Sequence, residues 1–171
     1  MRSLVALLVV AALAALPLAA GGSAWTSYLK VEDFADVLAL PDQVWGATAE
    51  AGLVRLDRVT GRTEAIRREP GRLASNRLSR LAVDPSGRLW VGTLDAGASL
   101  LTAAGEGAGT LNVLTGLPSS TVTALEAQGD TMWIGTTEGV ALWDGRQIAG
   151  SFPDPNAISF DTTFKIGRAH V

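Results

Sequence analysis

The stretch Leu89-Trp90-Val91-Gly92-Thr93 decides the fold, because the chain repeats it. Trp133-Ile134-Gly135-Thr136 is a close copy, and Trp45-Gly46-Ala47-Thr48 is a looser one that keeps the Trp and the Thr. The three tryptophans lie 45 and then 43 residues apart (90 − 45 and 133 − 90). Self-similarity with a period of about 40–50 residues is typical of propellers and solenoids.

Each copy lies within the same pattern of short runs in which apolar and polar residues alternate. A first run precedes the Trp, at 34–40, 78–83 and 122–126. The Trp segment itself is the second run. A third run follows it at 53–56, 99–101 and 140–143, and a fourth closes each unit at 64–66, 111–114 and 147–152. Turn residues such as Asp84-Pro85-Ser86-Gly87 separate the runs. Four short strands in about 40–45 residues predict a four-stranded antiparallel propeller blade.

The predicted fold class is therefore all-β, with a partial β-propeller over residues 25–164. The blades are expected at 34–66, 77–114 and 121–152, and 157–164 would start a fourth. Within the second blade, the Gly/Ala-rich segment 103–109 is predicted to be a mobile loop. Closed propellers have about four to eight blades. We expect three blades alone to form an incomplete propeller, poorly folded or stable only by association.

The first 24 residues have the pattern of a secretory signal peptide. Arg2 gives a positive start, Leu4–Leu16 is an unbroken apolar run, and small residues follow Pro17. This run is too short to span a bilayer comfortably. Cleavage is predicted after Ala24, with Ala20 as the alternative site and an uncleaved N-terminal anchor as a further alternative. The protein is predicted to be exported, to the periplasm or the extracellular space.

The segment 165–171 has a different predicted origin from the rest of the chain. Its last six residues, Ile166–Val171, are what one reading frame of a common short-read sequencing adapter encodes. We interpret this segment as adapter read-through and expect the natural gene to be longer; the alternative is a natural strand end. His170, the one histidine in the sequence, then has no functional meaning.

Composition excludes several classes of function. The chain has no cysteine, and its only histidine lies in the final segment, so Ser-His and Cys-His nucleophilic schemes and thiolate or imidazole metal sites lack their residues. A formal net charge of −3 argues against nucleic acid or an anionic membrane as partner. Beyond the signal peptide, no apolar stretch approaches membrane-spanning length. We predict no cofactor and no metal, and a protein that is not an enzyme.

The repeated residues are predicted to build blades. The aligned tryptophans lie in mid-strand, where each would pack blade against blade; the alternative is that they stack on sugars at a propeller mouth. The structural repeat comprises Trp45, Trp90, Trp133, Thr48, Thr93 and Thr136. Two further tryptophans, Trp25 and Trp143, lie outside this register and are candidates for surface anchors.

Three carboxylates recur at one position and are the candidate ligand-binding residues. Glu50, Asp95 and Glu138 each lie five residues after the aligned Trp, in the connection between the second and third strands. Equivalent loops of a propeller lie on one face around its channel, so the three acids would form an arc that binds a cation or a basic group. The alternative is that they are ordinary hairpin residues next to glycine.

The repeat unit resembles the two-component regulator propeller repeat. The segments Leu81–Thr93 (LAVDPSGRLWVGT) and Met132–Val140 (MWIGTTEGV) carry the resemblance, and the first blade departs from it at Gly46-Ala47. The opening Trp25–Tyr28 also looks like the start of secreted propellers, including those linked to the type IX secretion machinery. The resemblance extends over about 25–164, and its motif specifies fold more than function.

The resemblance implies a periplasmic, non-catalytic propeller that senses a ligand, such as a glycan or another small extracellular molecule, for signal transduction. A membrane span and a kinase would then follow the missing blades. The alternative is a secreted or surface-attached propeller that serves as a scaffold for protein partners. A propeller glycosidase or lyase is the third and least favoured hypothesis.

Overall fold

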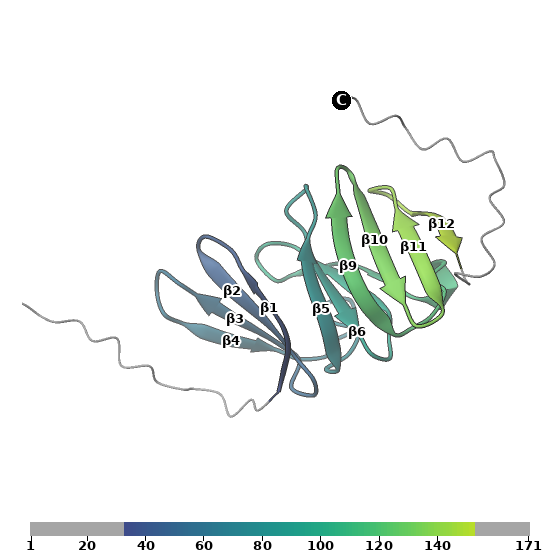
Figure 1. Cartoon of the computed structure of the whole chain (residues 1–171). Helices are drawn as coiled ribbons and strands as arrows, with labels where there is room; N and C mark the ends of the chain where they lie inside the picture. Colours follow the sequence, from purple (N-terminus) through teal and green to yellow (C-terminus); the bar gives the residue numbers. More distant parts are fainter. Residues whose placement is uncertain (1–32, 153–171) are drawn as a thin grey trace, which may run out of the picture.

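The computed structural model describes residues 33–152, which fold into twelve strands and one short 3-10 helix (Figure 1). The first sheet contains β1 (Phe34–Ala39), β2 (Gln43–Thr48), β3 (Leu53–Asp57) and β4 (Thr63–Ile66). The second contains β5 (Leu78–Val83), β6 (Leu89–Thr93), β7 (Ala98–Leu101) and β8 (Gly107–Leu111). The third contains β9 (Val122–Gln128), β10 (Thr131–Thr136), β11 (Gly139–Trp143) and β12 (Ile148–Phe152).

Every sheet is an antiparallel meander in which sequence neighbours pair. The strand orders are β1-β2-β3-β4, β5-β6-β7-β8 and β9-β10-β11-β12. The aligned Trp occupies the same place in each sheet, pairing with Leu38, Ala82 and Glu126 on the first strands. The prediction of three four-stranded blades is thereby confirmed.

The three sheets stand side by side, with their first strands adjacent. In Figure 1, β5 lies between β1 and β9. The backbone N–H of Leu81 donates to the Asp36 carboxylate at 2.9 Å, which joins β5 to β1. The chain passes from the outer strand of one blade to the inner strand of the next through residues 67–77 and 112–121, the blade links.

Each blade link contacts the turn between the second and third strands of the preceding blade. Gly52 N–H donates to the Asn76 carbonyl at 3.0 Å, and Gly97 N–H donates to the Ser120 carbonyl at 2.8 Å. We call this end of the blades the link end. The turns between first and second strands and between third and fourth strands lie at the opposite end.

The hydrophobic core consists of two clusters, one at each inter-blade interface. Trp45, Leu53 and Ile66 of blade one pack with residues of blade two, including Leu81, Leu89, Val91 and Leu101. Trp90 of blade two packs with Met132, Ile134 and Ala141 of blade three. Trp45 and Trp90 are completely buried. Each can bury about 150–250 Å², so these two residues pack blade against blade, as predicted.

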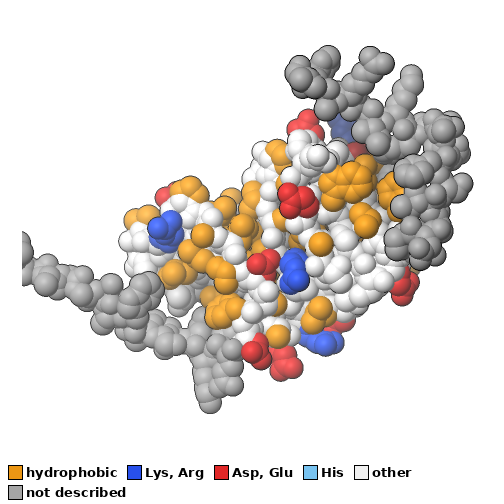
Figure 2. All heavy atoms as spheres, viewed as in Figure 1, with side chains coloured by type: hydrophobic (Ala, Val, Ile, Leu, Met, Phe, Trp, Pro, Cys, Tyr) orange, Lys and Arg blue, Asp and Glu red, His pale blue; other side chains and the backbone are white. Residues whose placement is uncertain are grey.

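Trp133 is only half-buried, although it occupies the same place in its repeat. Trp45 and Trp90 are covered by the following blade, whereas no described residue forms a further blade over Trp133. Val140 and Phe152 are 38% and 36% exposed. Figure 2 shows hydrophobic side chains on the surface of this third sheet. The prediction that all three tryptophans are inter-blade packing residues therefore holds for two of them in the described structure.

The fourth strand of blade two was predicted wrongly. We expected it at 111–114, but β8 spans Gly107–Leu111, and Val113–Thr115 form the 3-10 helix. The segment 103–109, predicted to be a loop, therefore provides the first half of this strand. Asn112 caps the helix by accepting from Leu114 N–H at 2.9 Å. Leu111 is the one buried residue of β8, so the apolar pattern that suggested a strand marks only its end.

Several predictions lie outside the described residues. These are the signal peptide at 1–24, Trp25, the strand expected at 157–164 and the read-through segment 165–171. Among the described residues, no helix is long and apolar enough to cross a membrane.

Candidate functional site

The repeated threonines close the turn at the link end of each blade. The Thr48 hydroxyl donates to the Gly52 carbonyl at 2.7 Å and accepts from Ala51 N–H at 2.9 Å. The Thr93 hydroxyl donates to the Gly97 carbonyl and accepts from Ala96 N–H, both at 2.8 Å. A hydroxyl can donate and accept at once, which these turns require.

Thr136 repeats this arrangement in blade three. Its hydroxyl donates to the Gly139 carbonyl at 2.8 Å and accepts from Glu138 N–H at 3.3 Å. The three threonines are thus structural residues, which explains why the repeat keeps Thr even in its looser first copy.

The three candidate acids lie on successive turns at the link end. Glu50, Asp95 and Glu138 are all exposed. The Asp95 carboxylate lies 3.7 Å from the Arg77 guanidinium, an ion pair in which both side chains are largely exposed. Such pairs contribute about 0–1 kcal/mol to stability. The acids are therefore accessible at the end of the blades where the sequence placed them.

The structure limits what the acids can do together. Within residues 33–152, no three carboxylate or histidine side chains come close enough to hold one metal ion. The turns that carry the acids are closed by the threonines, so the carboxylates are not needed to fix the turn backbone.

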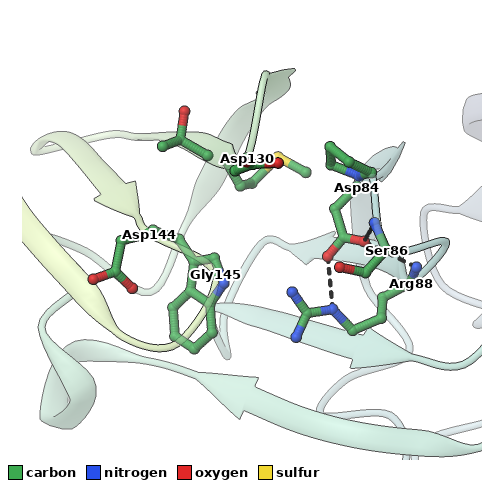
Figure 3. Close-up of a pocket in the computed structure, with 10 residues that line it drawn as sticks. Asp84, Ser86, Arg88, Asp130, Asp144 and Gly145 are labelled. Atoms are coloured by element: carbon green, nitrogen blue, oxygen red, sulfur yellow. Dashed lines mark hydrogen bonds and ion pairs between the residues drawn. The ribbon is translucent and has the colours of Figure 1, made fainter. Parts of the chain in front are cut away.

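A pocket of about 200 Å³ lies at the opposite end, between blades two and three. Residues of three segments line it: 84–88 of blade two, and 130–132 and 143–145 of blade three. Figure 3 shows Asp84, Ser86 and Arg88 on one side of the pocket, and Asp144 and Gly145 on the other. Trp143 also lines it, with its ring 5.7 Å from that of Trp90 in an edge-on arrangement. Trp143 is thus a packing residue, and the suggestion that it is a surface anchor is wrong.

Asp84 is the most fully bonded side chain of this pocket. One carboxylate oxygen accepts from Ser86 N–H at 2.9 Å and from Arg88 N–H at 3.0 Å. The other accepts from Arg88 Nε at 2.7 Å and from Trp90 Nε1 at 3.0 Å. The side chain is 5% exposed. Burial favours its neutral form, but the bonds from Trp90 and Arg88 outweigh burial and hold the pKa of Asp84 below its ordinary value.

The residue that begins the turn between the first and second strands of a blade determines whether the indole N–H of the aligned Trp has a hydrogen-bond partner. In blade three, Gln128 takes the place of Asp84, and its side-chain oxygen accepts from Trp133 Nε1 at 3.1 Å. In blade one, Leu40 stands there, and Trp45 Nε1 is buried with no partner. The sequence marked Asp84 only as a turn residue, and its spacing of six residues from Trp90 was the signal that could have identified the pair.

Asp144 at the other side of the pocket has a different role. One of its oxygens accepts from the backbone N–H groups of Arg146 and Gln147, both at 2.9 Å. These bonds, that of Gln147 first, lower the pKa of Asp144 below its ordinary value. Among the described residues, the Asp130 carboxylate forms no ion pair.

Comparison with known proteins identifies the repeat. Residues 72–95 match the family described as the two component regulator propeller. This segment covers β5, β6 and the turn with Asp84. No curated protein sequence matches the chain significantly.

Solved structures share the fold at low sequence identity. The extracellular domain of a protein described as a hybrid two component system of B. thetaiotaomicron is 21% identical, with a TM-score of 0.64, over 77% of this chain and 19% of that one. A second such domain from that organism is 17% identical, with a TM-score of 0.56, over 71% of this chain and 18% of that one. PorZ, a surface component of the type-IX secretion system of Porphyromonas gingivalis, is 19% identical, with a TM-score of 0.50, over 70% of this chain and 17% of PorZ.

The chain spans about one fifth of the length of these structural neighbours. At such identities the likeness shows the fold alone. The three meander sheets show an all-β, propeller-type fold, and within it the segment 72–95 is similar to the two component regulator propeller.

Proposed function

We propose that this chain belongs to an exported, non-catalytic propeller that binds a ligand outside the cytoplasm and acts as the sensor region of a two-component regulator. The observation that carries the proposal is the match of residues 72–95 to the regulator propeller repeat. The resemblance of the fold to extracellular domains of regulatory proteins supports it. The proposed signal peptide at 1–24 would bring the chain to the compartment where such ligands occur.

The proposed ligand site is the link end with Glu50, Asp95 and Glu138. These carboxylates are exposed, and the turn hydrogen bonds do not use them. Exposed carboxylates accept hydrogen bonds from hydroxyl and amino groups. A glycan or another small ligand with such groups suits this end.

The test replaces all three acids together. The substitutions Glu50→Ala, Asp95→Ala and Glu138→Ala are expected to leave the circular dichroism spectrum unchanged, because the threonines close the turns. Soluble oligosaccharides, screened by their effect on the melting temperature, should lose their effect in this variant. Asp42→Ala, at the opposite end, is the control. If binding of a positive oligosaccharide survives the triple substitution, the acids are turn residues only.

A second candidate function is a surface scaffold for protein partners. The structural likeness to PorZ, a surface component of a secretion system, favours this candidate. Reading the source DNA past the codon for Phe164, without adapter ligation, distinguishes the two. A frame that continues through further repeats to a membrane span and a kinase supports the sensor. A frame that ends in a sorting or adhesion domain supports the scaffold.

A further inference from the structure

The stack of blades has one uncovered sheet face at each end. Blade one and blade three lie at the two ends of the stack (Figure 1). The outer face of blade three carries Trp133, and the outer face of blade one is the side opposite Trp45. On the latter, Phe34 and Val37 are 52% and 57% exposed. Within residues 33–152, neither outer face has a sheet packed against it.

The outer face of blade one repeats a face that is buried in blade two. Strand pairing aligns Val37 with Leu81, because their partners on the second strands occupy the same place in the repeat. Leu81 is only 7% exposed, because blade one packs against it. The aligned pairs are Phe34 and Leu78, Val37 and Leu81, Val44 and Leu89, and Leu56 and Leu101. All eight residues are apolar, so blade one offers the kind of surface that blade two presents to Trp45.

One change in this surface is compensated within blade one. Gly46 occupies the position at which blade two has the completely buried Val91. The Phe34 ring takes up the space of the missing side chain, since its Cε1 lies 2.6 Å from the place of a Cβ on Gly46. The outer face of blade one is therefore apolar at this position as well.

The outer face of blade three repeats the other half of the same interface. The aligned residues are Trp45, Leu53 and Ile66 in blade one, Trp90, Ala98 and Leu111 in blade two, and Trp133, Val140 and Phe152 in blade three. In blades one and two they are buried in the inter-blade clusters. In blade three they are partly exposed. The two outer faces are thus the two halves of the interface that joins successive blades.

We propose that a second copy of this chain covers these faces, with its blade one packed on blade three of the first copy. The contact is head-to-tail, because it joins two different faces that match the existing inter-blade interfaces. A reciprocal contact between the remaining outer faces closes a ring of six blades, and closed propellers have about four to eight. The contact is separate from the proposed ligand site, whose acids lie on the turns at the link end.

Complementary charge variants test this arrangement by sedimentation velocity. Trp133→Glu blocks the outer face of blade three, Val37→Glu blocks that of blade one, and Val59→Glu is the control at an 80% exposed position. We expect the 171-residue chain to reach a limiting mass of two copies, and each blocking variant to weaken self-association at least about tenfold. A mixture of the two blocking variants retains one matching pair of faces and should form mixed pairs.

Disulfide formation tests which residues meet. The chain has no cysteine, so every disulfide comes from introduced residues. At the first interface, the Asp36 carboxylate accepts from Leu81 N–H at 2.9 Å, and the aligned positions across the proposed contact are Ala124 and Val37. Under mild oxidation, Ala124→Cys mixed with Val37→Cys should form mixed disulfides faster than either variant alone. Ala124→Cys mixed with Val59→Cys is the control.

Several results would overturn the proposal. If Val37→Glu self-associates as strongly as the unsubstituted chain, the contact joins two like faces instead of two different ones. A monomeric unsubstituted chain, a mass that grows beyond two copies, or equal disulfide rates in all mixtures would also contradict it. Should a charge variant lose its circular dichroism spectrum, the cysteine variants still decide, because they replace exposed side chains with a small one.

Discussion

At the scale of single residues, Asp84 links sequence to stability most directly. Its carboxylate accepts four hydrogen bonds, one of them from the fully buried Trp90. We expect Asp84→Ala to lower the free energy of unfolding by about 2–4 kcal/mol, because Trp90 Nε1 would lose its partner in a buried site. Urea unfolding measures this. Gln128→Ala is the matched control, since Gln128 bonds the half-buried Trp133 from an exposed position, and a loss below about 0.5 kcal/mol is expected. If Asp84→Ala lowers the free energy of unfolding by no more than Gln128→Ala does, the buried hydrogen bonds of Asp84 add no more stability than the exposed bond of Gln128.

The same residue predicts a pH dependence. The pKa of Asp84 is lowered in the folded protein from an ordinary value of 3.8. Its ionised form therefore contributes stability that is fully present above pH 3.8 and is lost as pH falls through the lower, folded pKa. The stability difference between the natural chain and Asp84→Asn should be constant from about pH 7 to pH 5 and shrink below pH 4. Urea unfolding at a series of pH values checks this, and a difference that grows on acidification would contradict it.

At the scale of elements, the closing threonines give a comparison between blades. Thr93 is completely buried and Thr136 is half-buried, yet both hydroxyls make the same two bonds. Thr93→Val keeps the shape of the side chain and removes both bonds, and we expect a loss of about 1–3 kcal/mol. Thr136→Val should cost less, because water can reach the groups that lose their partner. Thermal or urea unfolding of both variants decides, and a larger loss at Thr136 would contradict the argument.

The turn glycines differ in a way that the sequence does not show. Gly97 has φ +81°, and a Cβ there would lie only 2.0 Å from the Leu111 carbonyl oxygen. Gly61 has φ +70°, with open space around it. Gly61→Ala should cost about 1–2 kcal/mol for backbone conformation alone. Gly97→Ala should cost clearly more, because the backbone of β8 must also move. Similar losses in urea unfolding would show that this contact relaxes freely.

Much of the blade could be predicted from the sequence, because its strands alternate and its turns carry Pro, Asp and Gly. The fourth strand of blade two could not. Gly107–Thr110 are exposed and carry no large apolar side chain, so the pattern of Leu111–Leu114 dominated. An outer strand needs few buried side chains when backbone pairing to β7 holds it in place.

The pocket could not be predicted at all, for a different physical reason. Its walls come from turns of two different blades, with lining residues at 84–88, 130–132 and 143–145. How these turns face one another is a property of the packing between blades, whereas the alternating pattern reports only the faces of single strands. The turns that carry the acids of the link end follow from the repeat register alone, whereas binding by these acids stays a prediction.

At the scale of the whole molecule, the outer face of blade three leaves large apolar side chains exposed to solvent. Trp133 is half-buried, and Val140 and Phe152 are 38% and 36% exposed beside it. The equivalent surfaces of blades one and two are covered by the next sheet. Exposed apolar patches favour association. We expect the 171-residue chain to self-associate as its concentration rises, which sedimentation velocity measures.

Substitutions on this surface test whether it is the one that associates. Trp133→Glu adds a charge to its centre, and we expect it to shift the chain toward monomer by at least tenfold in dissociation constant. The control is Val59→Glu, at a position that is 80% exposed in the β3–β4 turn and remote from this surface. If both variants associate like the natural chain, another surface is responsible. If the unsubstituted 171-residue chain is a monomer with a cooperative thermal transition, three blades are sufficient for folding. The exposed apolar surface of blade three then costs less free energy than the usual value of about 25 cal/mol per Å² implies.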